Sequence, residues 1–340
     1  MKAAIYCGNR EMRVTDIPAP NLYNRDGAII KVKGCGLCGS DIVKISKNLV
    51  PERTVLGHEV VGIIKEINSS ENHGLQVGDR VALAHHVPCY NCRYCEQASY
   101  SMCNTFKKTN LDPGGFAEYT YISGSHLQYN TKKIPDHVND IQASLMEPLG
   151  CVLRALSRAN LSAGQTVLTI GLGFIGLLFI QAIKLFDCFA IGCDLIDERI
   201  FIASELGADL TLNSSDVNGC IESINKKIKF AGVDVVILCS GSDISSSFAM
   251  SAIRDGGKII VFSSIPNDNI GFLNNQVYYR ELSIIGAYSA TPEFLDPAIN
   301  YIKNNQISIG QYYKTMDIKS INSAVEKNIN HQTIKNFILL

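Results

Sequence analysis

The sequence predicts a two-domain α/β protein, in which a small β-barrel domain is followed by a doubly wound parallel sheet. Three observations support this fold class. The chain has 340 residues, a length that usually forms two domains. Residues 1–150 hold only short strand-like runs between turn residues, which is typical of a barrel. From about Cys151, strand-like and helical runs alternate, which indicates a parallel sheet covered on both faces.

Each domain has its own set of apolar runs, and we expect one strand at each run. The expected barrel strands are Ala3–Tyr6, Ala28–Gly34, Val60–Ile67, Arg80–Ala84 and Phe116–Ile122. The expected strands of the parallel sheet are Thr166–Ile170, Phe189–Asp194, Val233–Cys239, Lys258–Phe262 and Leu282–Gly286. Helical patterns cover Ile175–Lys184 and Glu198–Leu206. After Ala287 we expect a helix at about Pro292–Asn304, then short strands and one more helix.

The composition narrows the classes of function. A hydrophobic content of 46% with 19% charged residues is ordinary for a globular protein. The net charge of −1 gives no electrostatic reason to expect nucleic acid or an anionic membrane as a partner. The longest apolar run, residues 167–183, contains three glycines and Gln181, so we interpret it as a strand and a helix.

The beginning of the chain and its cysteines bear on the cell compartment. The chain enters a strand-like pattern at Met1, without the features of a signal peptide. Its 12 cysteines indicate metal ligands and reduced thiols rather than disulfides. We therefore expect a cytoplasmic protein.

Four cysteines form a compact metal-ligand pattern. Cys89, Cys92, Cys95 and Cys103 are spaced C-x2-C-x2-C-x7-C, as an insertion after the strand at Arg80–Ala84. Four thiolates on one loop suit a tetrahedral zinc ion. An iron–sulfur cluster is the alternative, although its usual pattern continues x3-C-P instead of x7-C. Because thiolates fill all four positions, we expect a structural zinc with no place for substrate.

A glycine motif predicts a nucleotide site in the second domain. Residues 171–176 read G-L-G-F-I-G, between an apolar strand and a helix, which is the dinucleotide-binding context of G-x-G-x-x-G. Asp194 ends the next strand, 23 positions after Gly171, where a carboxylate binds the adenosine ribose hydroxyls. Its charge would repel a 2′-phosphate and favours NAD. Nearby Arg199 leaves NADP open, and a helix cap is the alternative role of Asp194. The candidate cofactor-binding residues are Gly171, Gly173, Phe174, Ile175, Gly176, Asp194 and Arg199.

Three further motifs complete a family pattern. They are G-L-C-G-S-D at 36–41, L-G-H-E at 56–59 and M-E-P-L-G at 146–150. With the cysteine lobe and the glycine motif, in this order, the chain resembles the zinc-dependent medium-chain dehydrogenase/reductase family, which is alcohol dehydrogenase-like. The resemblance covers nearly the whole chain. It implies a GroES-like β-barrel catalytic domain at 1–150, completed by 287–340, and a Rossmann NAD-binding domain at 151–286.

The resemblance also implies a second, catalytic zinc. Its ligands would be Cys38, His58 and Glu59, with Glu147 as a fourth ligand or a close neighbour. Glutamate at 147 is similar to the sorbitol, sugar-alcohol-phosphate and threonine dehydrogenase branches. Asp41 would hold His58 in the right tautomer. A turn cap is the alternative for Asp41, and a core histidine is the alternative for His58.

The chemistry follows from the implied metal. Zinc lowers the pKa of a bound hydroxyl from near 16 toward about 7, and hydride then passes from the alcohol carbon to the nicotinamide. Ser40 lies where the family has a Ser or Thr that bonds the substrate oxygen and begins the proton relay. The family's relay histidine is replaced by Val43. We therefore expect the ribose hydroxyl to pass the proton to water, with Ser46 nearby.

The resulting expectation is an NAD-dependent zinc dehydrogenase with two zinc ions per subunit. Its substrate would be a secondary alcohol in a polyol, a sugar alcohol or its phosphate. L-threonine or cyclitol dehydrogenase is an alternative within the class, and a non-catalytic zinc- and dinucleotide-binding protein is the alternative outside it. Family members usually form dimers or tetramers through the edge strand of the Rossmann sheet, and Leu282–Gly286 is apolar enough to be that strand. We expect a homodimer or homotetramer.

Overall fold

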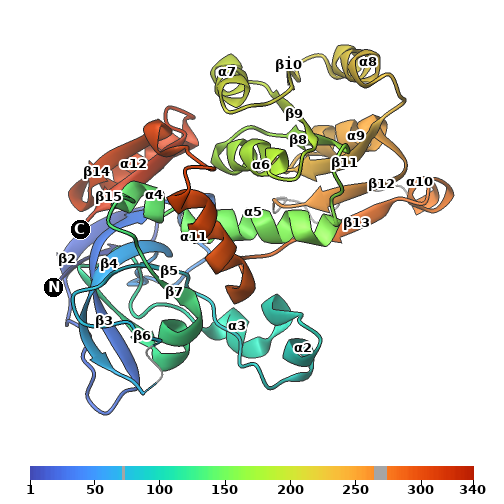
Figure 1. Ribbon diagram of the computed structural model, residues 1–340. Coiled ribbons are helices and arrows are strands. Elements are labelled where there is room, and N and C mark those ends of the chain that lie inside the picture. Colours follow the sequence, from blue (N-terminus) through green and yellow to red (C-terminus); the bar gives the residue numbers. More distant parts are fainter. Residues whose placement is uncertain (71–72, 264–273) are drawn as a thin grey trace. The chain divides into compact units, whose positions relative to one another are not determined.

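The computed structural model describes residues 1–70, 73–263 and 274–340, which form two compact units (Figure 1). The first unit contains Met1–Gly150 and Ala290–Leu340, and the second contains Cys151–Ser289. Helix α5 (Met146–Ala159) begins in the first unit and continues into the second. None of the helices in these described ranges is long and apolar enough to cross a membrane.

The first unit is built on a seven-stranded sheet and a two-stranded sheet. The large sheet has the order β14-β15-β3-β4-β5-β7, with β6 also paired to β3, and the small one pairs β1 with β2. All of these pairs are antiparallel except β14 with β15. The strands are β1 (Lys2–Tyr6), β2 (Met12–Asp16), β3 (Gly27–Gly36), β4 (Glu59–Asn68), β5 (Arg80–Leu83), β6 (Tyr119–Ser123), β7 (Thr131–Lys133), β14 (Tyr313–Asp317) and β15 (Lys335–Leu339).

Short helices fill the connections of this unit. They are α1 (Gly39–Ser46), α2 (Arg93–Glu96), α3 (Asn104–Lys108), α4 (Asp140–Ala143), α11 (Leu295–Lys303) and α12 (Ile321–Ile329). Single 3₁₀ turns cover Tyr100–Met102, Pro292–Phe294, Gly310–Tyr312 and Ile318–Ser320, and one π-helical turn covers His126–Asn130. The core lies between the strands, where Ile30, Val60, Phe116 and Ile338 are buried.

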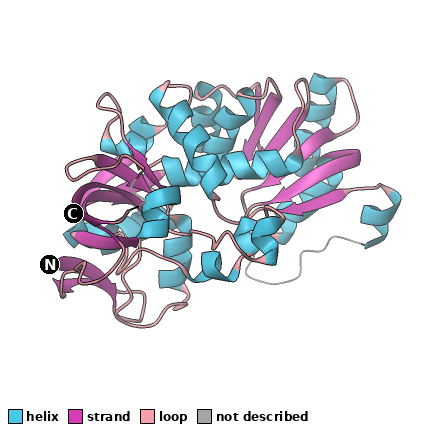
Figure 2. Ribbon diagram, turned by 60° about the horizontal axis from the view of Figure 1, so that its bottom comes forward, coloured by secondary structure: helices cyan, strands magenta, loops and turns pink. Residues whose placement is uncertain are grey.

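The second unit is a six-stranded parallel sheet in the order β10-β9-β8-β11-β12-β13 (Figures 1 and 2). Numbered within the unit, this is 3-2-1-4-5-6, the order of the doubly wound dinucleotide-binding fold. The strands are β8 (Thr166–Ile170), β9 (Phe189–Asp194), β10 (Leu210–Asn213), β11 (Val233–Leu238), β12 (Ile253–Val261) and β13 (Ser283–Gly286). The connecting helices are α6 (Phe174–Lys184), α7 (Asp197–Glu205), α8 (Val217–Ile228), α9 (Asp243–Ala252) and α10 (Asn274–Tyr279).

The predicted α/β class and the parallel sheet are therefore confirmed, and the differences lie in short or irregular elements. Strands β2, β7 and β10 were not expected. β10 has four residues and lies at the sheet edge, where half-burial leaves a weak apolar signal. Strand β12 begins at Ile253 instead of Lys258, because a register shift lets Ile253 pair with Val233 before the regular ladder starts.

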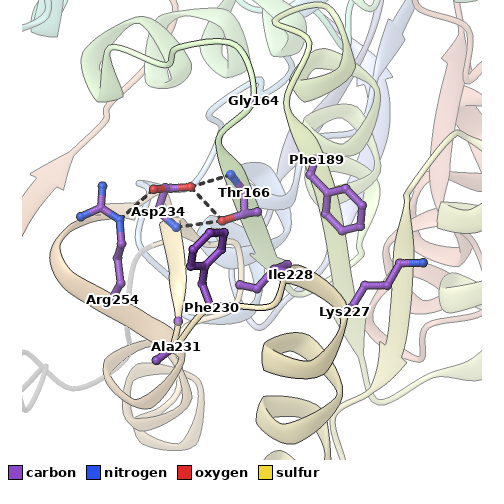
Figure 3. A pocket seen from close by; sticks show the side chains of 10 residues that line it. Gly164, Thr166, Phe189, Lys227, Ile228, Phe230, Ala231, Asp234 and Arg254 are labelled. Atoms are coloured by element: carbon purple, nitrogen blue, oxygen red, sulfur yellow. Dashed lines mark hydrogen bonds and ion pairs between the residues drawn. The ribbon is translucent and has the colours of Figure 1, made fainter.

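The half-buried carboxylate of Asp234 ties the beginnings of three strands of the parallel sheet together. Asp234 Oδ2 accepts hydrogen bonds from the Thr166 amide (2.7 Å) and hydroxyl (2.9 Å), and Oδ1 accepts one from Arg254 Nε at 2.7 Å. Burial alone would raise the pKa of Asp234, but the bonds from Thr166 and Arg254 lower it. Figure 3 shows this network beside a pocket of about 600 Å³ that Phe189 and Phe230 also line. The pocket lies where these parallel strands begin, whereas the glycine motif follows the end of β8.

We expect Asp234→Ala to lower the free energy of unfolding by about 1–3 kcal/mol at pH 7, because Thr166 and Arg254 lose a charged acceptor. A carboxylate whose folded pKa is lowered stabilises the fold above its unfolded pKa of about 3.9. That contribution disappears as the pH falls through the folded pKa. Urea unfolding followed by circular dichroism at several pH values measures the effect. Glu222→Ala, an exposed change on α8, is the control, and equal stability of Asp234→Ala and wild type at pH 7 would refute the prediction.

Candidate active site

The pairing of β3 with β4 brings the first motif residues together. Gly36, the last residue of β3, is the register partner of Glu59, the first residue of β4. Cys38 lies two residues after the end of β3 and is the N-cap of helix α1, and His58 directly precedes Glu59. The thiolate sulfur, an imidazole nitrogen and a carboxylate oxygen of Cys38, His58 and Glu59 lie within 4.8 Å of one another. One soft, one imidazole and one carboxylate ligand form a donor set that suits a catalytic zinc ion.

Asp41 lies behind His58, on the first turn of α1. Its Oδ1 is 3.4 Å from His58 Nδ1, and its Oδ2 accepts the Cys38 amide at 3.4 Å. Because Nδ1 faces this carboxylate, Nε2 is the nitrogen left to bind a metal ion. Burial alone would lower the pKa of His58, but Asp41 and Cys38 raise it well above its usual range. The same negative surroundings favour a metal cation.

Glu59 has one oxygen engaged and one without a hydrogen-bond partner. Oε1 accepts a hydrogen bond from Lys335 Nζ at 2.5 Å, and both side chains are almost fully buried. Oε2 is buried and has no hydrogen-bond partner among the residues that the structure describes. A Cβ at Gly36 would lie 1.9 Å from Oε2, so a larger residue there would displace the Glu59 carboxylate. An orphaned buried carboxylate oxygen beside a thiol and an imidazole fits a metal ligand.

Glu147 and an unexpected residue, His85, lie next to this group. Glu147 is buried at the start of α5, and its Oε1 is 4.0 Å from His85 Nδ1. Glu147 is not part of the cluster of three ligand atoms. The His85 ring packs against the His58 ring, with 4.5 Å between centroids. Sequence reasoning missed His85 because it belongs to no spaced motif; the only signal was a histidine pair directly after an apolar strand.

The proposed relay residues lie on α1. Ser40 is exposed in the first turn of the helix, and Val43 is 37% exposed one turn later. The hydroxyl of Ser46 is buried without a hydrogen-bond partner within the described part of the chain. No described contact joins Ser40 to the three-ligand group.

The four cysteines of the lobe converge on one point. The Sγ atoms of Cys89 and Cys103 are 3.5 Å apart, those of Cys92 and Cys95 are 3.6 Å apart, and those of Cys89 and Cys95 are 4.0 Å apart. A tetrahedral zinc with Zn–S bonds of about 2.3 Å places its sulfurs about 3.8 Å apart. All four thiols are free of disulfides, and buried Phe106 packs beneath them.

The glycine motif forms the turn between β8 and α6. Gly171 has a φ of +94°, which only glycine adopts without strain, and a Cβ at Gly176 would meet the Gly171 carbonyl oxygen at 2.0 Å. Gly173 is the N-cap of α6, whose first residues are Phe174 and Ile175. The first-turn amides of such a helix suit a diphosphate.

Asp194 supports the glycine turn from the end of β9. Its Oδ2 accepts the Leu172 amide at 2.6 Å and its Oδ1 accepts the Ile196 amide at 3.0 Å. Arg199 Nη1 is 3.7 Å from Oδ2. The bond to the amide of Ile196, the N-cap residue of α7, agrees with the alternative role of Asp194 as a helix cap. The bond to Leu172 links the glycine turn to the end of β9.

We expect Cys103→Ser to reduce the zinc content from about two ions per chain to about one, because a tetrahedral thiolate site loses a ligand. Elemental analysis of the purified protein measures the content. Cys188→Ser, a buried cysteine of the second unit outside both clusters, is the control. Iron with acid-labile sulfide in the wild-type protein would instead support the iron–sulfur alternative.

Comparisons with known proteins agree with this geometry. The model of the alcohol dehydrogenase GroES-like domain matches residues 24–136, and the model of the zinc-binding dehydrogenase matches residues 175–304. Sorbitol dehydrogenase of Bacillus subtilis is 30% identical over 335 residues, which cover 93% of each chain. L-idonate 5-dehydrogenase of Vitis vinifera is 31% identical over 84% of this chain and 79% of that protein.

Solved structures show the same fold. Alcohol dehydrogenase TADH from Thermus sp. ATN1 superposes with a TM-score of 0.90 at 22% identity, and each chain is covered in full. The fold, the motif order and the relatives lead to one conclusion. The chain belongs to the zinc-containing medium-chain dehydrogenase/reductase family, with a GroES-like domain and a six-stranded Rossmann sheet.

Proposed function

We propose that this zinc-dependent dehydrogenase oxidises a secondary alcohol of a polyol, a sugar alcohol or its phosphate, with NAD as the hydride acceptor. The observation that carries the proposal is the cluster of Cys38, His58 and Glu59, in which Glu59 Oε2 is buried without a partner among the described residues. The substrate class is supported by the relatives, whose names are sorbitol dehydrogenase and L-idonate 5-dehydrogenase.

Each residue of the cluster has a defined task in this proposal. Cys38, His58 and Glu59 would hold the zinc, which when bound lowers the pKa of the alcohol hydroxyl. Asp41 fixes the ring of His58, and Lys335 holds one oxygen of Glu59. Glu147 is buried beside the cluster, where it can fix the orientation of the alcohol.

Oxidation of the alcohol also requires that its hydroxyl proton be removed and that a cofactor accept the hydride. Ser40, exposed on the first turn of α1, would hydrogen-bond the alcohol oxygen and take part in moving its proton toward solvent. With Val43 in place of a relay histidine, the cofactor ribose and Ser46 are the remaining candidates for the later steps. NAD, which the glycine turn at Gly171–Gly176 and Asp194 would hold, would supply the acceptor for the hydride and its two electrons.

NAD is proposed over NADP because of Asp194. Its carboxylate, at the end of β9, suits ribose hydroxyls and would repel a 2′-phosphate. Arg199 is the cation that could favour NADP, but it lies within 3.7 Å of Asp194, which offsets its charge. We also propose that the four-cysteine lobe binds a second zinc ion, and that copies of the chain pair through the edge strand β13.

The direct test of the function is NADH formation over a panel of alcohols. We expect turnover with sorbitol, xylitol or other polyols or with their phosphates, and loss of turnover after a chelator removes zinc. Cys38→Ser should be inactive, while Cys188→Ser should retain activity. Turnover only with L-threonine or a cyclitol would correct the substrate class. No turnover with any alcohol by the zinc-loaded protein would favour the non-catalytic alternative.

The cofactor preference has its own test. We expect Asp194→Asn to narrow the preference for NAD over NADP, measured as the ratio of kcat/KM values, by at least about tenfold. One repulsive contact of about 1.4 kcal/mol corresponds to that factor. Asparagine keeps an oxygen for the Leu172 amide, and the thermal unfolding midpoint serves as the control for the turn. A wild-type enzyme that prefers NADP would contradict the assignment.

A further inference from the structure

His85 is a largely buried polar residue beside the proposed metal site, and the mechanism above does not use it. It lies just after β5, and its side chain is 13% exposed. Its ring centroid is 4.5 Å from that of His58 and 3.8 Å from that of His86. It is not among the three residues whose ligand atoms cluster, so this arrangement does not make it a metal ligand.

The two neighbouring histidines bond to the protein, His86 through one ring nitrogen and His126 through both. His86 Nδ1 is 2.6 Å from the Thr109 carbonyl oxygen. His126 Nδ1 is 2.8 Å from the Ser123 hydroxyl, and its Nε2 is 2.9 Å from the carbonyl oxygen of His85. These two residues therefore act as structural links, and the second one fixes the backbone at His85.

His85 differs from both because its Nδ1 is buried without a hydrogen-bond partner among the described residues. Glu147 Oε1 is 4.0 Å away, which is beyond hydrogen-bonding distance. In a neutral ring with its proton on Nε2, the lone pair is on Nδ1, the atom without a partner, and can accept a hydrogen bond from a hydroxyl. A buried ring nitrogen without a partner costs stability, which is offset when a bound molecule supplies the missing hydrogen bond.

We propose that His85 determines substrate specificity: its imidazole accepts a hydrogen bond from a hydroxyl on the carbon next to the reacting carbon, so that the site favours vicinal diols over simple secondary alcohols. This inference rests on the proposed function, because the ring lies against His58 and Glu147, where the alcohol would bind. A second hydroxyl fits the ring better than a metal does, since Cys38, His58 and Glu59 already supply a ligand set. In this arrangement Glu147 and His85 would together orient a bound polyol.

The experiment compares butane-2,3-diol with butan-2-ol, which differ by one hydroxyl on the neighbouring carbon. In the wild type we expect a higher kcat/KM for the diol. His85→Phe keeps an aromatic ring of similar size and removes both nitrogens. It should lower kcat/KM for the diol by about 10-fold to 100-fold more than for butan-2-ol. His85→Gln, which retains hydrogen-bonding atoms, should recover part of that difference.

A matched control and a readout without turnover separate specificity from stability. His86→Phe makes the same change one residue away, and it should leave the ratio between the two alcohols unchanged even if both rates fall. In the cobalt-substituted protein without nucleotide, visible absorbance titrations give the dissociation constant of each alcohol. We expect the cobalt spectrum of His85→Phe to match that of the wild type, while its diol affinity falls.

Two outcomes would overturn the role of His85. The first is that His85→Phe lowers the two kcat/KM values equally, and the second is that the wild-type cobalt protein binds the diol no more tightly than butan-2-ol. If no alcohol of the wider panel is oxidised, the proposed function fails. The binding ratio of the cobalt protein then still decides whether His85 recognises a second hydroxyl.

Discussion

The candidate active site depends on the buried ion pair between Glu59 and Lys335. Lys335 is 276 residues further along the chain, yet it reaches Glu59 because β15 pairs with β3 and β3 pairs with β4. Two charges removed from water hold each other only in good geometry, and loss of one partner of such a pair typically costs about 3–5 kcal/mol. The last strand of the sheet and the carboxylate of Glu59, a proposed metal ligand, are therefore stabilised together.

The sequence predicted those parts of the molecule whose signals are local. The spacing of four cysteines within fifteen residues indicated one metal-binding loop, and their sulfurs do converge. The glycine motif between a strand and a helix indicated the turn that Gly171 and Gly176 form, because only the absence of a side chain permits that close approach. The α/β class followed from the alternation of strand-like and helical runs after Cys151, the family followed from the order of the motifs, and both are confirmed.

The parts that the sequence could not predict depend on contacts between distant segments. Lys335 belongs to no motif, and nothing near it in the chain indicates a buried carboxylate partner. His85 becomes notable only when β5, β4 and α5 place it against His58 and Glu147. The sequence also did not predict that Asp194 accepts a hydrogen bond from the backbone amide of Leu172, because its motif indicated only a contact with the ribose.

The pairing of the C-terminal strand β15 with β14 (parallel) and with β3 (antiparallel) has a consequence for biosynthesis. The ribosome completes residues 151–289 before it makes the strand that carries Lys335. The cofactor-binding unit contains all of its own strands, so it can fold while the chain is still being translated. The sheet of the first unit cannot be completed until β15 is synthesised, so until then β3 lacks this neighbouring strand. Nascent chains are thus exposed to aggregation at β3 until their last strand emerges, and chaperone binding at this stage would protect the proposed metal ligands as well as the sheet.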